Sequence, residues 1–181
     1  MPRRSVYRLD QHPSSPRSRK VVCAVLLRGD PVELVTVDVG PADGLDRVPV
    51  LHTDQGTLWE ATTILEWLEE RERVLLPPGT EHAARHWDRV GDRHLLDVDP
   101  SDPRAWLRAG ATLEVIATRL ADGREFLCGD PFTLADLGPA IGAEELRHAG
   151  LALPPPVEAW LERCLALGPL RDQVALARAL R

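Results

Sequence analysis

The stretch that decides the fold is Arg-Val-Pro-Val-Leu at residues 47–51, followed within one hairpin by Leu-Trp-Glu-Ala-Thr-Thr-Ile-Leu at residues 58–65. Proline has no N–H to donate to a sheet, so Pro49 belongs at the first residue or the edge of a strand. The bond before it is of the X-Pro type, in which the cis form costs only about 0.5–1 kcal/mol. We therefore expect a cis peptide that turns the backbone groups of Val48 outward.

The second part of this stretch places an acid at the start of a helix. Glu60 precedes a run in which Ile64, Leu65 and Leu68 recur at helical spacing. The dipole and the free N–H groups at a helix N-terminus favour an anion. Backbone amides beside a carboxylate can hold both ends of a zwitterionic ligand. The two segments together therefore predict a ligand site.

Length and composition restrict the class of protein. The chain has 181 residues, enough for one generous domain or two small ones, and a formal net charge of −6. Such a charge argues against nucleic acid as the main partner. No apolar run approaches the ~20 residues that span a bilayer, so no membrane partner is expected. Three cysteines without C-x-x-C spacing indicate a reduced, cytoplasmic protein.

The pattern along the first part of the chain predicts an α/β unit. β-Branched runs predict strands, Ser15-Pro16 predicts a helix start, and 54–56 is typical of a hairpin turn. In order we expect a strand over 6–9, a helix over 16–27, a strand over 32–39, a hairpin of 50–53 with 57–59, and a helix over 60–71. The first three make a right-handed βαβ unit, and the whole fits a thioredoxin-like fold.

The second part is helical in pattern throughout. After a linker at 75–80, apolar residues three and four apart predict helices over 81–96, 103–120, 133–148, 155–167 and 170–180. Thr133 and Asp136 form a capping box at the start of the third of these, with Asp in the usual Glu place. We expect a thioredoxin-like domain over 1–73 and an all-helical domain over 80–181.

Read together, these pieces resemble the cytosolic glutathione transferase superfamily over nearly the whole chain, as a shortened, divergent, bacterial and serine-type-like member. The resemblance rests on the order and spacing of HPSSP at 12–16 with RKV at 19–21, RVPVL at 47–51, LWEA at 58–61 and FLCGDPFTLAD at 126–136. It implies a thioredoxin-like N-terminal domain followed by an all-α helical C-terminal domain, a cis-proline and a homodimer.

The resemblance also implies a site. In serine-type members the serine that opens the first helix donates a hydrogen bond to the glutathione sulfur, and this position matches Ser15. A thiolate at a helix N-terminus gains from the hydroxyl and from the dipole. The alternative is that Ser15 merely caps the helix, and Ser14 is the adjacent competitor. The residues implied to bind the thiol are Arg47, Val48, Pro49, Glu60, Ala61 and Thr62.

The sequence departs from the family pattern within this site. The family's Glu-Ser pair, which holds the γ-glutamyl end, appears here as Glu60-Ala61, and Thr62 is one residue late. Losing a hydrogen bond to a charged group weakens binding by about 1.5–3 kcal/mol. The connection over 40–47 is also short where the family usually places an extra helix that grips the glycyl end.

The helix that follows the linker carries one pair of possible metal ligands. His82 and His86 lie four residues apart and can face one metal ion. The other nearby ligands, Asp88 and Asp92, lie on other faces of the helix. We therefore expect no metal, and a solvated helix surface instead.

Two enzymatic classes and one non-catalytic class remain open. The first is thiol-dependent conjugation, lyase or isomerase chemistry on a hydrophobic electrophilic small molecule, with glutathione or another low-molecular-weight thiol as co-substrate. The second is a thiol-independent isomerase, cyclase or lyase of a biosynthetic pathway on the same scaffold. The third is a non-catalytic binding module. The sequence names neither the substrate nor the reaction type.

Overall fold

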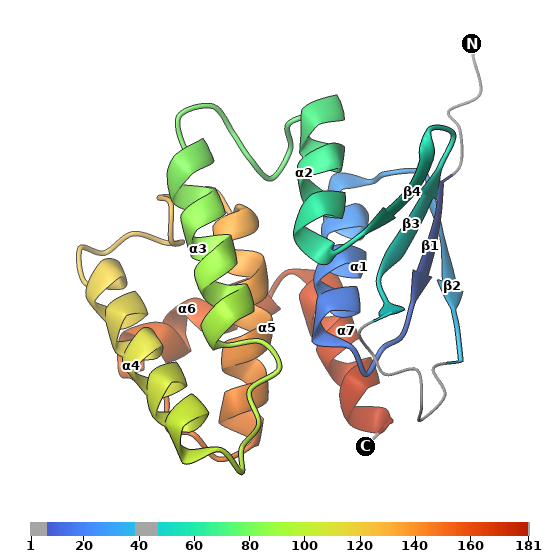
Figure 1. Cartoon of the computed structure of the whole chain (residues 1–181). Coiled ribbons are helices and arrows are strands. Elements are labelled where there is room, and N and C mark those ends of the chain that lie inside the picture. Colours follow the sequence, from blue (N-terminus) through green and yellow to red (C-terminus); the bar gives the residue numbers. More distant parts are fainter. Residues whose placement is uncertain (1–6, 39–46, 181) are drawn as a thin grey trace.

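A computed structural model describes residues 7–38 and 47–180 (Figure 1). The N-terminal part is a four-stranded sheet of order β2-β1-β3-β4, in which β1 and β2 are parallel and the other neighbours are antiparallel. Its elements are β1 (Tyr7–Gln11), α1 (Pro16–Arg28), β2 (Val32–Thr36), β3 (Val50–Thr53), β4 (Gly56–Trp59) and α2 (Ala61–Arg71). In Figure 1, α1 and α2 lie between the sheet and helices α3 to α6, and α7 lies below α1.

The C-terminal part is helical. It contains α3 (Glu81–His94), α4 (Pro103–Leu120), α5 (Leu134–His148), α6 (Pro155–Leu165) and α7 (Gly168–Ala179). Between residues 60 and 180 the only extended pairing is an isolated bridge between Phe126 and Gly129. No helix in the described ranges is long and apolar enough to cross a membrane. The predicted fold class, a thioredoxin-like domain followed by an all-helical domain, is confirmed.

Some element bounds differ from the predicted ones. The strand β2 ends at Thr36 rather than at 39, because its partner strand ends at Gln11, the residue paired with Thr36. The last helix begins at Gly168, two residues earlier than predicted, because Pro169 fits its first turn. The predicted strand start at residue 6 and the short connection over 40–46 lie outside the described residues. The domain limits 1–73 and 80–181 stay a prediction.

Two glycine contacts bring α3 and α5 close together. A Cβ added to Gly91 of α3 would lie 2.6 Å from Cδ of Pro139, and one added to Gly142 of α5 would lie 2.6 Å from Cβ of Leu95. The buried Arg19 of α1 also forms an ion pair with Glu145 of α5. The α5 helix is therefore the central element against which α1 and α3 pack.

The predicted capping box at the start of α5 is confirmed, and it also organises a loop. The buried Asp136 carboxylate accepts hydrogen bonds from the backbone N–H of Thr133 at 3.0 Å and of Leu127 at 2.9 Å, and from Nε1 of Trp160 at 2.9 Å. Burial raises the pKa of Asp136 despite these bonds. One carboxylate thus joins α5, the preceding loop and α6.

The linker between the two parts is fixed at its first residues. Glu69 of α2 accepts hydrogen bonds from the backbone N–H groups of Val74 and Leu75, and its carboxylate pairs with the buried Arg28 of α1. The carbonyl of Leu75 accepts from the N–H of Leu134, the first residue of α5, at 2.8 Å. The linker backbone is therefore bonded to elements of both parts.

Candidate functional site

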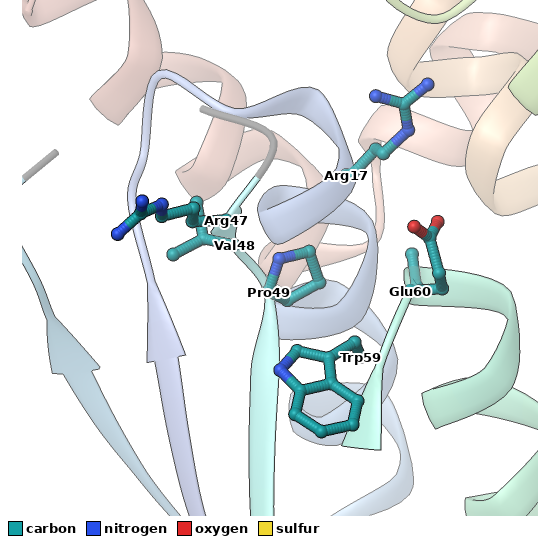
Figure 2. A pocket seen from close by; sticks show the side chains of 7 residues that line it. Arg17, Arg47, Val48, Pro49, Trp59 and Glu60 are labelled. Carbon is teal, nitrogen blue, oxygen red and sulfur yellow. The ribbon is translucent and has the colours of Figure 1, made fainter. Parts of the chain in front are cut away.

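A cavity of about 200 Å³ lies where the start of β3 approaches the turn from β4 into α2 (Figure 2). It is lined by Arg17, Arg47, Val48, Pro49, Trp59, Glu60 and Ala61. The segment that decided the fold and the acid at the helix start therefore line one cavity, although a hairpin separates them in the sequence. Of the residues that the resemblance implied for thiol binding, Arg47, Val48, Pro49, Glu60 and Ala61 meet here.

The Val48–Pro49 peptide forms one wall of the cavity. Both residues are buried, the bond between them is cis, and Pro49 directly precedes β3. Since proline donates no hydrogen bond, its place just outside the strand leaves the sheet pairing intact: the ladder with β1 begins at Val50. The ring of Pro49 lies at the centre of the site in Figure 2.

Glu60 has an unusual backbone conformation. Its φ of 68° and ψ of 126° lie outside the regions that side-chain-bearing residues normally adopt, which costs on the order of 1–3 kcal/mol. Glu60 is the N-cap of α2, yet its carboxylate forms no cap hydrogen bond with the helix. The side chain is exposed at the cavity instead. Such a strained residue at the mouth of a pocket is typical of a functional position, and the sequence alone gave no sign of the strain.

Ser15 is the N-cap of α1. Its Oγ accepts a hydrogen bond from the N–H of Ser18 at 3.3 Å, and the side chain is only 2% exposed. It is not among the residues that line the cavity. The structure thus shows the capping role; a hydroxyl that accepts from Ser18 still has its own proton to donate, so a second role toward a ligand stays a prediction.

Thr62 directs its side chain toward α3 and not into the cavity, and a role of its backbone N–H toward a ligand stays a prediction. Its hydroxyl donates to Oδ2 of Asp92 on α3 at 2.9 Å, and it does not line the cavity. The neighbouring Ala61 does line it. The Thr62 hydroxyl therefore does not replace the missing hydroxyl at position 61, and it joins α2 to the helical part.

A buried ionic cluster lies behind the start of α2. Lys20 of α1, the only lysine in the chain, is fully buried and pairs with Asp88 at 2.6 Å and with Asp92 at 2.7 Å. Burial raises the pKa of Asp88 to about 6; Lys20 lowers it in part, and Asp92 raises it further. Together with the bond from Thr62 to Asp92, the cluster joins α3 to α1 and α2, whose first turns line the cavity.

Sequence reasoning missed Arg17 and Trp59 as lining residues. Arg17 lies in the first turn of α1, and its Nη1 forms an ion pair with Oδ2 of Asp97 at 2.7 Å. Asp97 follows α3 and is the other non-glycine residue with a positive φ in the described ranges, at 54°. Trp59 ends β4 and is 64% exposed. The sequence held one signal for Arg17, since a residue two places after a helix cap lies at the same helix end as the cap.

The three cysteines have no nucleophilic setting. Burial raises the pKa of Cys23 to about 12, raises that of Cys164 well above its usual value, and raises that of the half-buried Cys128. All three are free thiols. In the described part of the chain no group of three or more potential ligands, around His82 and His86 or elsewhere, is placed to hold a metal ion.

Comparison with known proteins gives a consistent result. Residues 9–78 match the family model described as the N-terminal domain of glutathione S-transferase. A diazinon-metabolizing glutathione S-transferase of the silkworm Bombyx mori superimposes with a TM-score of 0.81 at 18% identity, over 96% of this chain and 97% of that one. No curated protein matches the chain.

Two bacterial structures are also similar. A glutathione S-transferase of Methylobacterium radiotolerans, in complex with glutathione sulfonate, has a TM-score of 0.73 at 28% identity, over 94% of this chain and 95% of that one. A glutathione transferase of Methylococcus capsulatus has a TM-score of 0.78 at 22% identity, over 96% and 100%. These likenesses extend over both the sheet-containing part and the helical part.

Proposed function

We propose that this protein is a member of the glutathione transferase superfamily, because residues 9–78 match the N-terminal domain of that family and the fold is similar over nearly the whole chain. As such it is a thiol-dependent enzyme that binds glutathione, or another low-molecular-weight thiol, and acts on a hydrophobic electrophilic small molecule. The reaction is a conjugation, or a lyase or isomerase reaction in which the thiol adds and then leaves.

The observation that carries the proposal is the meeting of Val48, Pro49, Glu60 and Ala61 in one cavity. A buried backbone segment that precedes a strand offers amide groups to a peptide-like ligand. The exposed carboxylate of Glu60 is suited to an ammonium group, and the uncapped N-terminus of α2 is suited to a carboxylate. Glutathione carries all three kinds of group.

The sulfur of such a ligand would lie at the N-terminus of α1. There the positive end of the helix dipole and a hydroxyl proton from Ser15 both stabilise a thiolate, which lowers the pKa of the thiol and raises the fraction that is reactive at neutral pH. Within the protein, Ser15 thus acts on the sulfur while Glu60 and the start of α2 bind the other end of the thiol.

The main alternative is a site without thiol chemistry, either a thiol-independent isomerase, cyclase or lyase or a non-catalytic binding module. One observation favours it: the Ser15 side chain is buried, caps α1 and does not line the cavity. In that case the cavity binds a small molecule without activating a sulfur.

Calorimetric titration with glutathione, followed by turnover of a chromogenic aromatic halide, tests the proposal. Ser15→Gly is the sharper variant, because glycine at an N-cap costs the helix only a few tenths of a kcal/mol whereas alanine costs about 1 kcal/mol. We expect Ser15→Gly to keep glutathione binding and to lower kcat about ten- to a thousandfold. Ser14→Gly is the matched control and should retain turnover. Full turnover by Ser15→Gly without added thiol would support the alternative.

We also propose a homodimer, from the resemblance to the family and because Leu107 and Val115 of α4 are 74% and 58% exposed. Sedimentation equilibrium at micromolar concentration tests it, and a monomer there would contradict it. A cytoplasmic location is proposed on the basis of the three free cysteines.

A further inference from the structure

One side of α3 is occupied almost entirely by arginine and histidine side chains. They recur three and four residues apart, a spacing that keeps them on one face of a helix. Buried residues of the same helix, among them Ala84 and Gly91, lie on the opposite side and pack into the core. This α3 basic face consists of the arginines Arg85, Arg89 and Arg93 and the histidines His82, His86 and His94, and all six line a hollow of about 430 Å³.

Neighbouring acids balance little of the positive charge on the α3 basic face. Glu66 of α2 contacts it, with Oε1 lying 3.5 Å from Nε of Arg85 and 3.4 Å from Nη2 of Arg89. Within residues 7–38 and 47–180, Arg93 forms no ion pair. The acids of α3 itself bond elsewhere: Glu81 pairs with Arg73, and Asp88 and Asp92 pair with Lys20. Most of the charge on this face is therefore available to a bound anion.

The row Arg85, Arg89 and Arg93 works against the stability of its own helix. Like charges four residues apart repel one another on a helix surface. The chain as a whole has a formal net charge of −6 and a single lysine, which is buried, so this concentration of positive charge is local. An anion bound along the row would remove the repulsion.

The spacing of the row indicates the kind of anion. Successive arginines of the row are separated by about 6 Å along the helix axis, and the whole row spans about 12 Å. A guanidinium binds a phosphate group through two parallel N–H donors, and the adjacent imidazoles add further N–H donors. The hollow is of the size that small-molecule sites have. An elongated small molecule with several linked phosphate groups fits these features.

Two larger polyanions fit less well. A long nucleic acid would be repelled by the net charge of −6 over the rest of the molecule. An acidic helix of a partner protein would need apolar anchors, and Val90 is the only apolar residue that lines the hollow.

We propose that the α3 basic face is a binding site for a small oligophosphate, either inorganic or the triphosphate chain of a nucleotide. Arg85 and Arg93 bind the two ends of the phosphate chain and Arg89 binds its middle. Glu66 competes with the ligand for Arg85 and Arg89. The hollow shares no lining residue with the cavity at Pro49, so this site goes beyond the proposed thiol-dependent function and is tested without it.

Calorimetric titration of the full chain with tripolyphosphate and with orthophosphate, at about 0.1 M salt, tests the proposal. We expect one site that binds tripolyphosphate at least about tenfold tighter than orthophosphate, because only the longer anion reaches all three arginines. The double variant Arg89→Gln, Arg93→Gln should weaken tripolyphosphate binding by about tenfold or more. The matched control is Arg108→Gln, Arg171→Gln, which removes the same charge at arginines that are 57% and 67% exposed and should stay within about twofold of the wild type.

A variant that gains affinity separates recognition from structural damage. Glu66→Gln removes the competing carboxylate beside Arg85 and Arg89, and we expect it to tighten tripolyphosphate binding about two- to fivefold. Titration with adenosine triphosphate distinguishes the two sources of the phosphate chain. Affinity equal to that of tripolyphosphate supports an inorganic or nucleotide ligand alike, and tighter binding supports a nucleotide.

Three results would overturn the proposal. The first is no binding of tripolyphosphate at millimolar concentration. The second is an equal loss in the two double variants, which would reduce the effect to the general charge of the protein. The third is binding of a polyglutamate peptide without binding of tripolyphosphate, which would make an acidic protein segment the occupant. Circular dichroism melts of each variant show that the fold is intact.

Discussion

Nζ of Lys20 lies 2.7 Å from Oδ1 of Asp92, and this buried contact joins the first helix of the sheet-containing part to the first helix of the helical part. The other oxygen of Asp92 accepts from the hydroxyl of Thr62 at the start of α2. One carboxylate of α3 is therefore shared by α1 and α2, the two helices whose first turns line the candidate cavity. A change in this cluster should affect stability and the shape of the cavity together.

Lys20→Met should lower the free energy of unfolding by about 3–5 kcal/mol. The substitution removes the cation and leaves the buried carboxylate of Asp88 without its compensating charge. Urea denaturation followed by tryptophan fluorescence measures the change. The triple variant with Lys20→Met, Asp88→Asn and Asp92→Asn, which removes the charges together, should recover a large part of the loss. A loss below about 1 kcal/mol in the single variant would contradict the prediction.

The stability of the protein should depend on Asp88 between about pH 4 and pH 6. The pKa of this carboxyl is raised from 3.8 to about 6, mainly by burial, so between these values the folded chain holds a proton that the unfolded chain has released. Its stabilising contribution is complete below pH 3.8 and is lost as the pH rises through 6. A pKa difference of about two units between the folded and the unfolded state corresponds to roughly 3 kcal/mol of unfolding free energy.

The effect of Asp88 is measured by comparing the unfolding free energy of the wild type with that of Asp88→Asn at each pH. Other carboxyls, such as Asp10, have lowered pKa values and stabilise the fold as the pH rises, so the wild-type profile alone mixes opposite trends. We expect the unfolding free energy of the wild type minus that of Asp88→Asn to fall between pH 4 and pH 6. A difference that stays constant or rises over this window would show that Asp88 does not titrate as described.

Gly91→Ala should destabilise the protein by several kcal/mol. The new methyl group would lie 2.6 Å from Cδ and 2.7 Å from the backbone nitrogen of Pro139, and a proline in the middle of α5 cannot move aside alone. Gly110→Ala in α4 is the matched control, since its Cβ would have nothing within 4 Å. There the gain in helix propensity should stabilise the protein by about 0.5–1 kcal/mol. Thermal melts that place both variants on the same side of the wild type would be inconsistent with this packing.

Asp136→Ala should cost more than about 3 kcal/mol. It leaves the buried N–H groups of Leu127, Thr133 and Trp160 without their shared acceptor. Asp130→Ala, an exposed aspartate in the preceding loop, should change stability by less than about 0.5 kcal/mol. Chemical denaturation of the pair measures both effects, and equal losses would show that the hydrogen bonds of Asp136 contribute nothing specific.

The sequence predicted the fold well where local chemistry sets the structure. Ser15-Pro16 starts α1, Thr133 and Asp136 start α5, and the hairpin forms at its expected turn, because caps and turns depend on a few neighbouring residues. The ends of β2 and α7 were less predictable. A strand ends where its partner ends, as at Thr36, and that information lies in another part of the chain.

The site was predictable only in part for the same reason. The lining of the cavity by Pro49 and Glu60 follows from motifs with fixed spacing, and the resemblance identified them. The hydrogen-bond partner of the Thr62 hydroxyl is Asp92, 30 residues away in the sequence. The ion-pair partner of Arg17 is Asp97, which is also distant in the sequence. No local pattern encodes such pairings between the two parts. The single lysine was the one compositional sign of the buried cluster.

The hydrogen bonds of the Leu75 backbone in the linker affect how a small molecule can reach the cavity. Its N–H is bonded to the carboxylate of Glu69 and its carbonyl to the N–H of Leu134, so the chain between the two parts is fastened at both backbone groups. Such a segment cannot serve as a hinge without breaking buried hydrogen bonds. We therefore expect the linker not to open at this point, and we expect access to the cavity to depend on side chains at its rim, above all on the exposed Trp59.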